Sequence, residues 1–352
     1  MSIIESFSEL PALIARELET RRQVVVVLLD AFGWAFVQRH ERHPLLARFA
    51  RDGTLAPLRS QFPSTTTAHV TTMHTGLPVE DHGLYEWRVW EPALEGVTIP
   101  LLVGGDDSAG FATRSLLPEG PSFYQRLAIR AGVASTVFSP ARFSPSGYDA
   151  IAVRGARLVP YDDLSSITLP VGDEKSYVYV YWDMIDAVGH RHGPSSPEFD
   201  DACLRALDGL YGVFFGPESA SFSDTLLLLT ADHGQIDVSP DSLDLLDIPD
   251  ALPAGSARDL FLHVSEDRVD STLSAINTTL GDHGTAVRSS TLFPTPGPRL
   301  AARLAPICVL PAPGRMVWLR GHEDDPQLSF LGHHGGQTPE ESTSFLGTLE
   351  LG

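Results

Sequence analysis

Residues 24–30 read Val-Val-Val-Val-Leu-Leu-Asp, a continuous apolar run that ends in a carboxylate. Two further runs have the same character: Tyr-Val-Tyr-Val-Tyr at residues 177–181 and Leu-Leu-Leu-Leu at residues 226–229. Continuous rather than alternating hydrophobicity is typical of strands that are covered on both faces, as in a parallel sheet. The three runs therefore predict the buried centre of an α/β fold.

Segments with helical character alternate with these strands along the chain. We expect helices over residues 44–52, 122–131 and 198–212, and an amphipathic helix near the N-terminus. Strands that alternate with helices in this way predict an open, mostly parallel sheet with helices packed on it.

Around residues 240–320 the expected elements become shorter, and Pro and Gly become more frequent. This part contains a strand-like segment at 260–264 and a helix-like segment at 271–280. We therefore expect an α/β core made of residues 1–240 and 320–352, interrupted by a small α+β cap at 241–319.

The composition disfavours two classes of partner. The chain has 352 residues, of which 43% are hydrophobic and 20% charged, as expected of a globular protein. Its formal net charge of -20 disfavours polymeric nucleic acid and anionic membranes. No apolar run is long enough to cross a bilayer, and the N-terminal segment lacks the pattern of a signal peptide. The expected location is therefore cytoplasmic.

Each of the three apolar runs is followed closely by acidic residues: Asp30 after the first, Asp183 and Asp186 after the second, and Asp232 after the third. Ligands of open α/β sheets bind beyond the carboxyl ends of the strands, so these side chains are expected to converge. A single aspartate at such a place is more often a helix cap or a turn. Acidic residues after all three strands together favour a functional site.

Histidines accompany two of these carboxylates. His190 follows Asp186 by four residues, and His233 directly follows Asp232, while His333-His334 precedes a Gly-Gly pair near the C-terminus. Carboxylate and imidazole are suitable ligands for zinc or manganese, and a set of this size is enough for two ions. The plain alternative is a group of unrelated surface or core histidines.

A hydroxyl-rich loop leads into a helix at residues 62–76 and contains Thr65, Thr66 and Thr67. A helix N-terminus offers backbone N–H groups and a positive dipole to an anionic substrate, and a metal could ionise one of the hydroxyls. The alternative is a threonine-rich helix N-cap without chemistry.

In this order the motifs resemble the alkaline phosphatase superfamily, and specifically its nucleotide pyrophosphatase/phosphodiesterase branch. The resemblance spans residues 24 to about 341 and is carried by these motifs: Leu-Leu-Asp30, Pro-Ser-Thr-Thr66 running to Thr75-Gly76, Asp81-His82-Gly83, Asp186-x-x-x-His190-x-x-Gly193-Pro194, Ala-Asp232-His233-Gly234 and His334-Gly-Gly. It implies a three-layer sandwich with a mostly parallel central sheet and a small cap insertion.

The resemblance also implies two divalent metal ions, most simply zinc, with manganese as the alternative. One ion would be held by Asp30, Thr66, Asp232 and His233, and the other by Asp186, His190 and His334. Thr66 corresponds to the family nucleophile because it lies three residues after Pro63, with Thr65 and Thr67 as the alternatives. The alternatives to the chosen histidines are His333 and His192, and Asp81-His82 corresponds to a structural turn outside the metal set.

His69 is a second catalytic candidate. Relatives that cleave nucleotides carry Asn at this position, three residues after the nucleophile, and this chain carries His. An imidazole could donate a hydrogen bond to a phosphoryl oxygen in its place. The alternative is a helix residue beside the metals without a catalytic role.

The expected reaction is metal-dependent hydrolysis of phosphodiester or pyrophosphate bonds in small nucleotide-like or other organic phosphate esters, through a phospho-threonine intermediate on Thr66. A diester is favoured over a monoester because the core motifs contain no Arg or Lys, although Arg88 weakens this argument. The neighbouring segment 84–90 is aromatic and provides either a surface for an organic group or ordinary packing.

Three other functions remain open at this point. A phosphonate hydrolase of the phosphonoacetate type or a phosphomonoesterase would use the same two-metal site. A metal-binding module with a silent site would keep the fold, but the complete ligand set argues against it.

Overall fold

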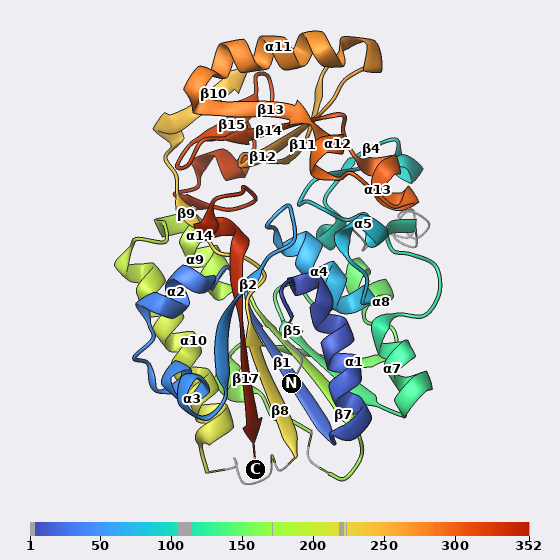
Figure 1. Ribbon diagram of the computed structural model, residues 1–352, viewed down its shortest axis with the longest axis vertical. Coiled ribbons are helices and arrows are strands. Elements are labelled where there is room, and N and C mark those ends of the chain that lie inside the picture. The colour runs from blue at the N-terminus through green and yellow to red at the C-terminus, as the bar shows by residue number, and fades with distance from the viewer. Residues whose placement is uncertain (1–3, 104–114, 171, 218–221, 223, 352) are drawn as a thin grey trace.

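A seven-stranded sheet runs through the centre of the molecule (Figure 1). The computed structural model describes residues 4–103, 115–170, 172–217, 222 and 224–351. From one edge to the other, the strands are β2 (Thr54–Arg59), β17 (Thr343–Leu351), β8 (Thr225–Thr230), β1 (Gln23–Leu29), β7 (Ser176–Trp182), β5 (Ala134–Pro140) and β6 (Ala156–Tyr161). Within this described sheet, β17 runs in the direction opposite to the other six strands, which are all parallel to one another. This confirms the prediction of a mostly parallel sheet.

The three apolar runs of the sequence form the adjacent central strands β8, β1 and β7. Alternate residues of β1 enter different cores: Val24 and Val26 pack on one face of the sheet, and Val25 and Val27 pack on the other. All seven residues of β1 are buried. The strand is apolar throughout because neither face meets water.

Helices cover both faces of the sheet and make it the middle layer of three (Figure 1). One face carries α1 (Leu10–Thr20), α4 (Thr66–Thr75), α7 (Phe123–Ala131) and α8 (Gly147–Ala152). The other face carries α2 (Trp34–Arg39), α3 (Pro44–Asp52), α9 (Met184–His192) and α10 (Pro197–Phe215). The helices expected at 44–52, 122–131 and 198–212 are therefore present as α3, α7 and α10.

Local sequence explains where these helices begin. Ser122 caps α7 by accepting a hydrogen bond from the backbone N–H of Gln125, whose side chain in turn accepts one from the backbone N–H of Ser122. Pro44 and Pro197 occupy the first positions of α3 and α10, where a missing N–H carries no penalty.

A second, smaller sheet lies above the carboxyl ends of the parallel strands (Figure 1). Its antiparallel strands, in spatial order, are β11 (Leu252–Ser256), β12 (Asp259–His263), β14 (Ile307–Pro311) and β13 (Gly284–Arg288). The helix α11 (Val269–Leu280) packs on this sheet, and the strands β10 (Leu243–Leu246) and β15 (Met316–Leu319) contribute to the same hydrophobic core. The boundaries of the cap at residues 241 and 319 stay a prediction.

Short elements connect the two sheets: α5 (Val79–His82), α12 (Ser289–Leu292), α13 (Pro298–Arg303), α14 (Pro339–Ser342), β3 (Val89–Glu91), β4 (Gly96–Thr98), β9 (Ile236–Asp237) and β16 (Gly332–His333). Strand register brings Leu29 opposite Trp182 and Leu28 opposite Thr230, so β1, β7 and β8 end at one edge of the sheet, facing the cap. Among the described helices, none combines the length and the apolar character needed to cross a bilayer.

Candidate active site

Thr66 is the first residue of α4 and lies beside the end of β1. Its Oγ1 is 3.3 Å from Asp30 Oδ2 and 3.3 Å from His233 Nε2. His233 Nε2 is also 3.4 Å from Asp30 Oδ1 and 3.5 Å from Asp232 Oδ2. The structure thus brings together the hydroxyl, the two carboxylates and the imidazole that the sequence assigned to the first metal.

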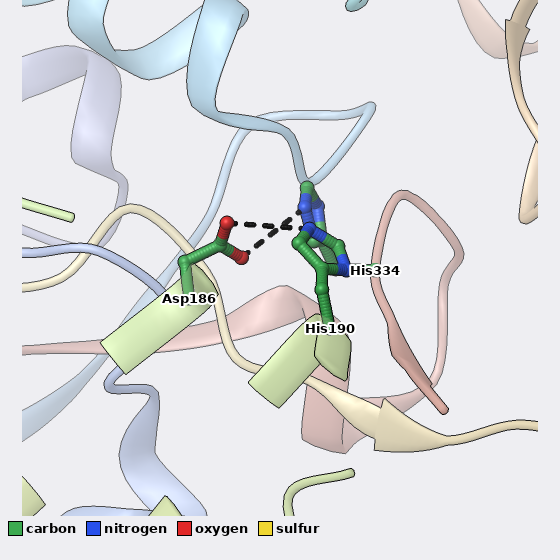
Figure 2. A group of neighbouring side chains, drawn as sticks. All are labelled: Asp186, His190 and His334. Carbon is green, nitrogen blue, oxygen red and sulfur yellow. Dashed lines mark ion pairs between the residues drawn. The ribbon is translucent and has the colours of Figure 1, made fainter. Parts of the chain in front are cut away.

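The second expected group is also assembled (Figure 2). Asp186 and His190 stand one turn apart on α9, so they share a face of that helix, and Asp186 Oδ2 lies 3.2 Å from His190 Nε2. His334 comes from the segment after β16 and places its Nε2 3.6 Å from Asp186 Oδ1. The ligand atoms of these three residues all lie within 4.8 Å of one another.

Backbone carbonyl groups fix the orientation of all three histidines. The Nδ1 atoms of His190, His233 and His334 lie 2.8, 3.1 and 2.9 Å from the carbonyl oxygens of Gly332, Gly234 and Ser64. An Nδ1–H that donates to a carbonyl leaves Nε2 as the lone-pair nitrogen, which is the arrangement found around metal-ligating histidines. Each ring therefore presents its Nε2 to the site.

The alternative histidines lie elsewhere. The Nδ1 of His333 accepts the backbone N–H of His334 at 2.9 Å, and its Nε2 lies 3.2 Å from Gln327 Oε1. His192 is exposed at the end of α9. Atoms of Asp30, Asp186 and His233 also fall within 4.8 Å of one another, so the two groups adjoin and Asp186 reaches both.

The site contains buried carboxyl groups that lack an Arg or Lys partner among the described residues. Burial, followed by repulsion from Asp232 and Asp186, raises the pKa of Asp30 well above its ordinary value. Burial also raises the pKa of Asp232 to about 7, and its Oδ2 has no hydrogen-bond partner among the described residues. No Arg or Lys of the described chain forms an ion pair with these two carboxylates. Divalent cations would remove this penalty, so the donor set fits two metal ions.

Asp186 differs from the other two carboxylates. Burial by itself would raise its pKa, but His190 and His334 outweigh that effect and the net shift is downward. The same interaction with Asp186 raises the pKa of His190 against the opposing effect of burial. Asp186 is thus the carboxylate best kept ionised by its neighbours.

Three residues that support the ligands could not be found from sequence motifs. The hydroxyl of Tyr181 donates to Asp30 Oδ2 at 2.5 Å. Gln235 donates from its Nε2 to Asp186 Oδ1 at 2.5 Å, and a Cβ at Gly189 would lie 1.9 Å from Gln235 Oε1. Ala31 has a φ of 61°, an uncommon value for a residue with a side chain, and donates its N–H to Asp232.

A buried ion pair anchors the segment that follows His334. Arg258, in the turn between β11 and β12, donates from Nε and Nη2 to the two carboxylate oxygens of Glu341 at 3.0 and 2.9 Å. Glu341 also accepts the backbone N–H of Gly336 at 3.0 Å and the hydroxyl of Thr338 at 2.8 Å. The cap is therefore tied to the loop that carries His334.

The neighbours of Thr66 have other positions. Thr65 is the N-cap residue of α4, and its hydroxyl donates to the carbonyl oxygen of Tyr85 at 2.9 Å. Thr67 is buried, and its hydroxyl has no hydrogen-bond partner among the described residues. Of the three threonines, only Thr66 has its hydroxyl recorded within hydrogen-bond distance of the Asp/His groups.

His69, the second catalytic candidate, has both ring nitrogens in contact with backbone groups. Its Nε2 accepts the backbone N–H of Gln61 at 2.9 Å, and its Nδ1 lies 2.7 Å from the carbonyl oxygen of Thr65. Burial lowers the pKa of His69 to about 3, which keeps the ring neutral. Both ring nitrogens are engaged with the loop that precedes α4, so this arrangement leaves no N–H for a phosphoryl oxygen.

Two cavities meet at Thr66. One, of about 520 Å³, extends along Tyr148, Tyr179 and Tyr181. The other, of about 380 Å³, extends under the cap along Arg88 and Gln327. The aromatic segment 84–90 is divided between packing and surface: Tyr85 is buried in the core, whereas the half-exposed Trp87 lines both cavities.

A family model described as type I phosphodiesterase/nucleotide pyrophosphatase matches residues 24–337. The chain belongs to this family. The family uses two metal ions, in agreement with the two adjoining ligand groups.

Several proteins of this family are detectably similar to the chain. Venom phosphodiesterase 2 of Crotalus adamanteus is 23% identical over an alignment of 234 residues that covers 63% of this chain and 28% of the venom protein. The human ectonucleotide pyrophosphatase/phosphodiesterase family member 1 is 23% identical over an alignment of 208 residues that covers 54% of this chain and 21% of that protein. The chain thus aligns with about a quarter of the length of these relatives.

Solved structures of the family share the fold. Murine ectonucleotide pyrophosphatase/phosphodiesterase 5, in an inactive form in complex with AMP, superposes with a TM-score of 0.73 at 19% identity, covering 94% of this chain and 88% of that chain. The human protein of the same name gives a TM-score of 0.69 at 18% identity, covering 93% and 87%. This likeness confirms the expected alkaline-phosphatase-like architecture.

Proposed function

We propose that this chain hydrolyses phosphodiester or pyrophosphate bonds of small organic phosphates, with Thr66 as the nucleophile. The observation that carries the proposal is the position of Thr66 Oγ1, which lies 3.3 Å from both Asp30 and His233 at the N-terminus of α4. Membership of the phosphodiesterase family supports the reaction class.

Asp30, Asp232 and His233, together with Thr66, would hold one cation, and Asp186, His190 and His334 would hold the other. The mixture of carboxylate and imidazole donors favours zinc, with manganese as the alternative. When bound, such cations lower the pKa of the nucleophilic hydroxyl and stabilise negative charge on the departing oxygen.

The reaction at phosphorus has two steps, the first of which is carried out by Thr66. Thr66 Oγ1 attacks phosphorus, a bond forms between Oγ1 and phosphorus, and the bond from phosphorus to the leaving oxygen breaks. Water then attacks phosphorus of the phospho-threonine, the bond between phosphorus and Oγ1 breaks, and a proton from the water restores the threonine hydroxyl as the phosphate product leaves. The backbone N–H groups at the start of α4 would donate hydrogen bonds to the phosphoryl oxygens. The positive end of the helix dipole would stabilise their negative charge.

A nucleotide-like or other organic substituent is favoured by the two cavities beside Thr66 and by the AMP complex of the murine relative. The residues that line the 520 Å³ cavity include several apolar and aromatic side chains, among them Val70, Phe143 and Tyr148. The cytoplasmic location and the absence of a nucleic-acid or membrane partner stay predictions.

The proposal is tested with zinc-loaded protein and three substrates side by side: bis(4-nitrophenyl) phosphate, 4-nitrophenyl phosphate and phosphonoacetate. We expect the diester to be hydrolysed best. Thr66→Ala should lower its turnover at least about 1000-fold while leaving close to two metals per chain. The matched control is Thr278→Ala, which removes an exposed hydroxyl on α11.

Each other outcome identifies a different function. Preference for phosphonoacetate or for the monoester would replace the proposal with a phosphonate hydrolase or a phosphomonoesterase. Fewer than two metals per chain with no hydrolysis of any of the three substrates would indicate a metal-binding module.

A further inference from the structure

The 380 Å³ cavity beside Thr66 has three polar side chains in its wall that each keep one atom without a hydrogen-bond partner among the described residues: Glu86, and the two neutral side chains Thr67 and Gln327. Gln327 is 6% exposed and Thr67 is 1% exposed. Gln327 Nε2 and Thr67 Oγ1 have no hydrogen-bond partner among the described residues. Unpaired buried polar groups are costly and rare, and they often mark a place where a ligand or a water binds.

The network around Gln327 fixes which end of its amide is the oxygen. The backbone N–H of Ala257 can only donate, and it lies 2.8 Å from the Gln327 side-chain oxygen. The Nδ1 of His333 accepts from the backbone N–H of His334, so Nε2 of the neutral ring carries the hydrogen and donates to the same oxygen at 3.2 Å. The unused end of the amide is therefore the NH2 group, a donor.

Thr67 provides the second unused group. It follows the nucleophile directly, and its hydroxyl can donate or accept a hydrogen bond. Thr67 and Gln327 belong to distant parts of the chain, the start of α4 and a short 3-10 helix at Pro326–Ser329. Both line the cavity together with Thr66, Asp186 and His190.

The charges in the rest of this wall are balanced. Arg88 Nη2 lies 2.7 Å from Asp325 Oδ2, so the guanidinium is already paired. Glu86 accepts the backbone N–H of Trp87 with Oε2, while its Oε1 has no hydrogen-bond partner among the described residues, and burial raises the pKa of this carboxyl to about 7. This wall therefore offers no surplus positive charge to a second phosphate or to a carboxylate.

We propose that the 380 Å³ cavity binds an uncharged, oxygen-bearing substituent of the phosphodiester, such as a polyol or sugar, and that Gln327 and Thr67 are the residues that select it. Their unused hydrogen-bonding groups meet oxygen atoms of this substituent. A substrate without these oxygens leaves both groups unpaired, which is how a site rejects an analogue that lacks a hydroxyl. This inference rests on the proposed function, because it names a substituent of the same substrate.

Two synthetic diesters test it: glyceryl 4-nitrophenyl phosphate and propyl 4-nitrophenyl phosphate. They share the leaving group and the number of carbons in the other substituent, and they differ by two hydroxyls. We expect the zinc-loaded wild-type protein to show a kcat/KM at least about tenfold higher for the glyceryl ester. The ratio of the two values is the readout, because a general loss of activity or of folded protein cancels in it.

Two variants then assign the preference. Gln327→Glu keeps an oxygen for Ala257 and His333 but removes the donor, and Thr67→Val removes only the hydroxyl. We expect each to lower the ratio by about threefold or more, and the double variant to bring it close to 1. The matched control, Gln38→Glu on an exposed position of α2, should keep the wild-type ratio.

A wild-type ratio near 1, with both esters hydrolysed, would overturn this inference and leave the proposed function standing. A high ratio that both variants retain would overturn it equally. If neither diester is hydrolysed, the proposed function fails, and the inference fails with it.

Discussion

The ion pair between Arg258 and Glu341 gives a sharp prediction, because it joins the cap to the loop that carries His334, a proposed metal ligand. The two side chains are 1% and 0% exposed, and two hydrogen bonds of 3.0 and 2.9 Å connect them. Glu341→Gln keeps one oxygen for the backbone N–H of Gly336 but places an NH2 group against Arg258 Nη2 and the hydroxyl of Thr338. The buried guanidinium then has no counter-charge.

Removing one partner of a buried ion pair costs about 3–5 kcal/mol. We therefore expect Glu341→Gln to lower the free energy of unfolding by about 3 kcal/mol, and Arg258→Met to lower it by a similar amount. The double variant removes both charges at once, so its loss should be smaller than the sum of the single losses by at least about 2 kcal/mol.

The measurement is urea unfolding at a fixed pH and metal concentration, followed by tryptophan fluorescence and extrapolated to water. Zinc content measured on the same samples reports whether the loop of His334 is loosened. A loss below about 1 kcal/mol in Glu341→Gln would contradict this role of the ion pair, and so would single losses that add within about 0.5 kcal/mol.

Three further outcomes are expected. Gln235→Leu removes the hydrogen bond to Asp186 and should weaken metal binding about 10- to 100-fold in a chelator competition, with no change expected for the exposed Gln38→Leu control. Burial raises the pKa of Glu86 to about 7, so the folded state holds its proton and loses stability as pH rises from about 4.5 through 7. Glu86→Gln should therefore be more stable than the wild type by about 1–3 kcal/mol at pH 8, with little difference at pH 5; an equal gain at both pH values would contradict this explanation. Metal removal with a chelator should lower the melting temperature more at pH 7.5 than at pH 5.5, because the raised pKa values of Asp30 and Asp232 let protons replace the cations at the lower pH; calorimetry that shows the reverse order would count against the metal assignment.

The centre of the sheet could be predicted because its strands have a simple environment. Strands β8, β1 and β7 are buried on both faces, and their apolar runs stand out in the sequence. The outer strands β2 and β6 are largely exposed or half-exposed and carry no such run. The position of β17 depends on pairing with residues nearly 300 positions earlier, and no local pattern encodes such pairing.

The convergence of the expected metal-binding side chains could be predicted because carboxylates at strand ends and histidines at short spacing form recognisable motifs. The residues that hold them in place could not be predicted, because Tyr181 and Gln235 act by single contacts that only the folded chain creates. Hydrogen bonding of His69 could not be predicted either. Its place in the motif suggested contact with substrate, whereas both its ring nitrogens contact the backbone of the loop that precedes α4.

The insertion of β17 between β8 and β2 has a consequence for the order of events on the ribosome. Among the described strands, β2 pairs only with β17, which is made almost 300 residues later. A nascent chain therefore carries β2 without its partner strand until β17 has been made, with its backbone hydrogen-bonding groups open to other chains. The exposed Arg59 at the end of this strand, and the proline within it at position 57, would discourage such premature association until β17 has been made.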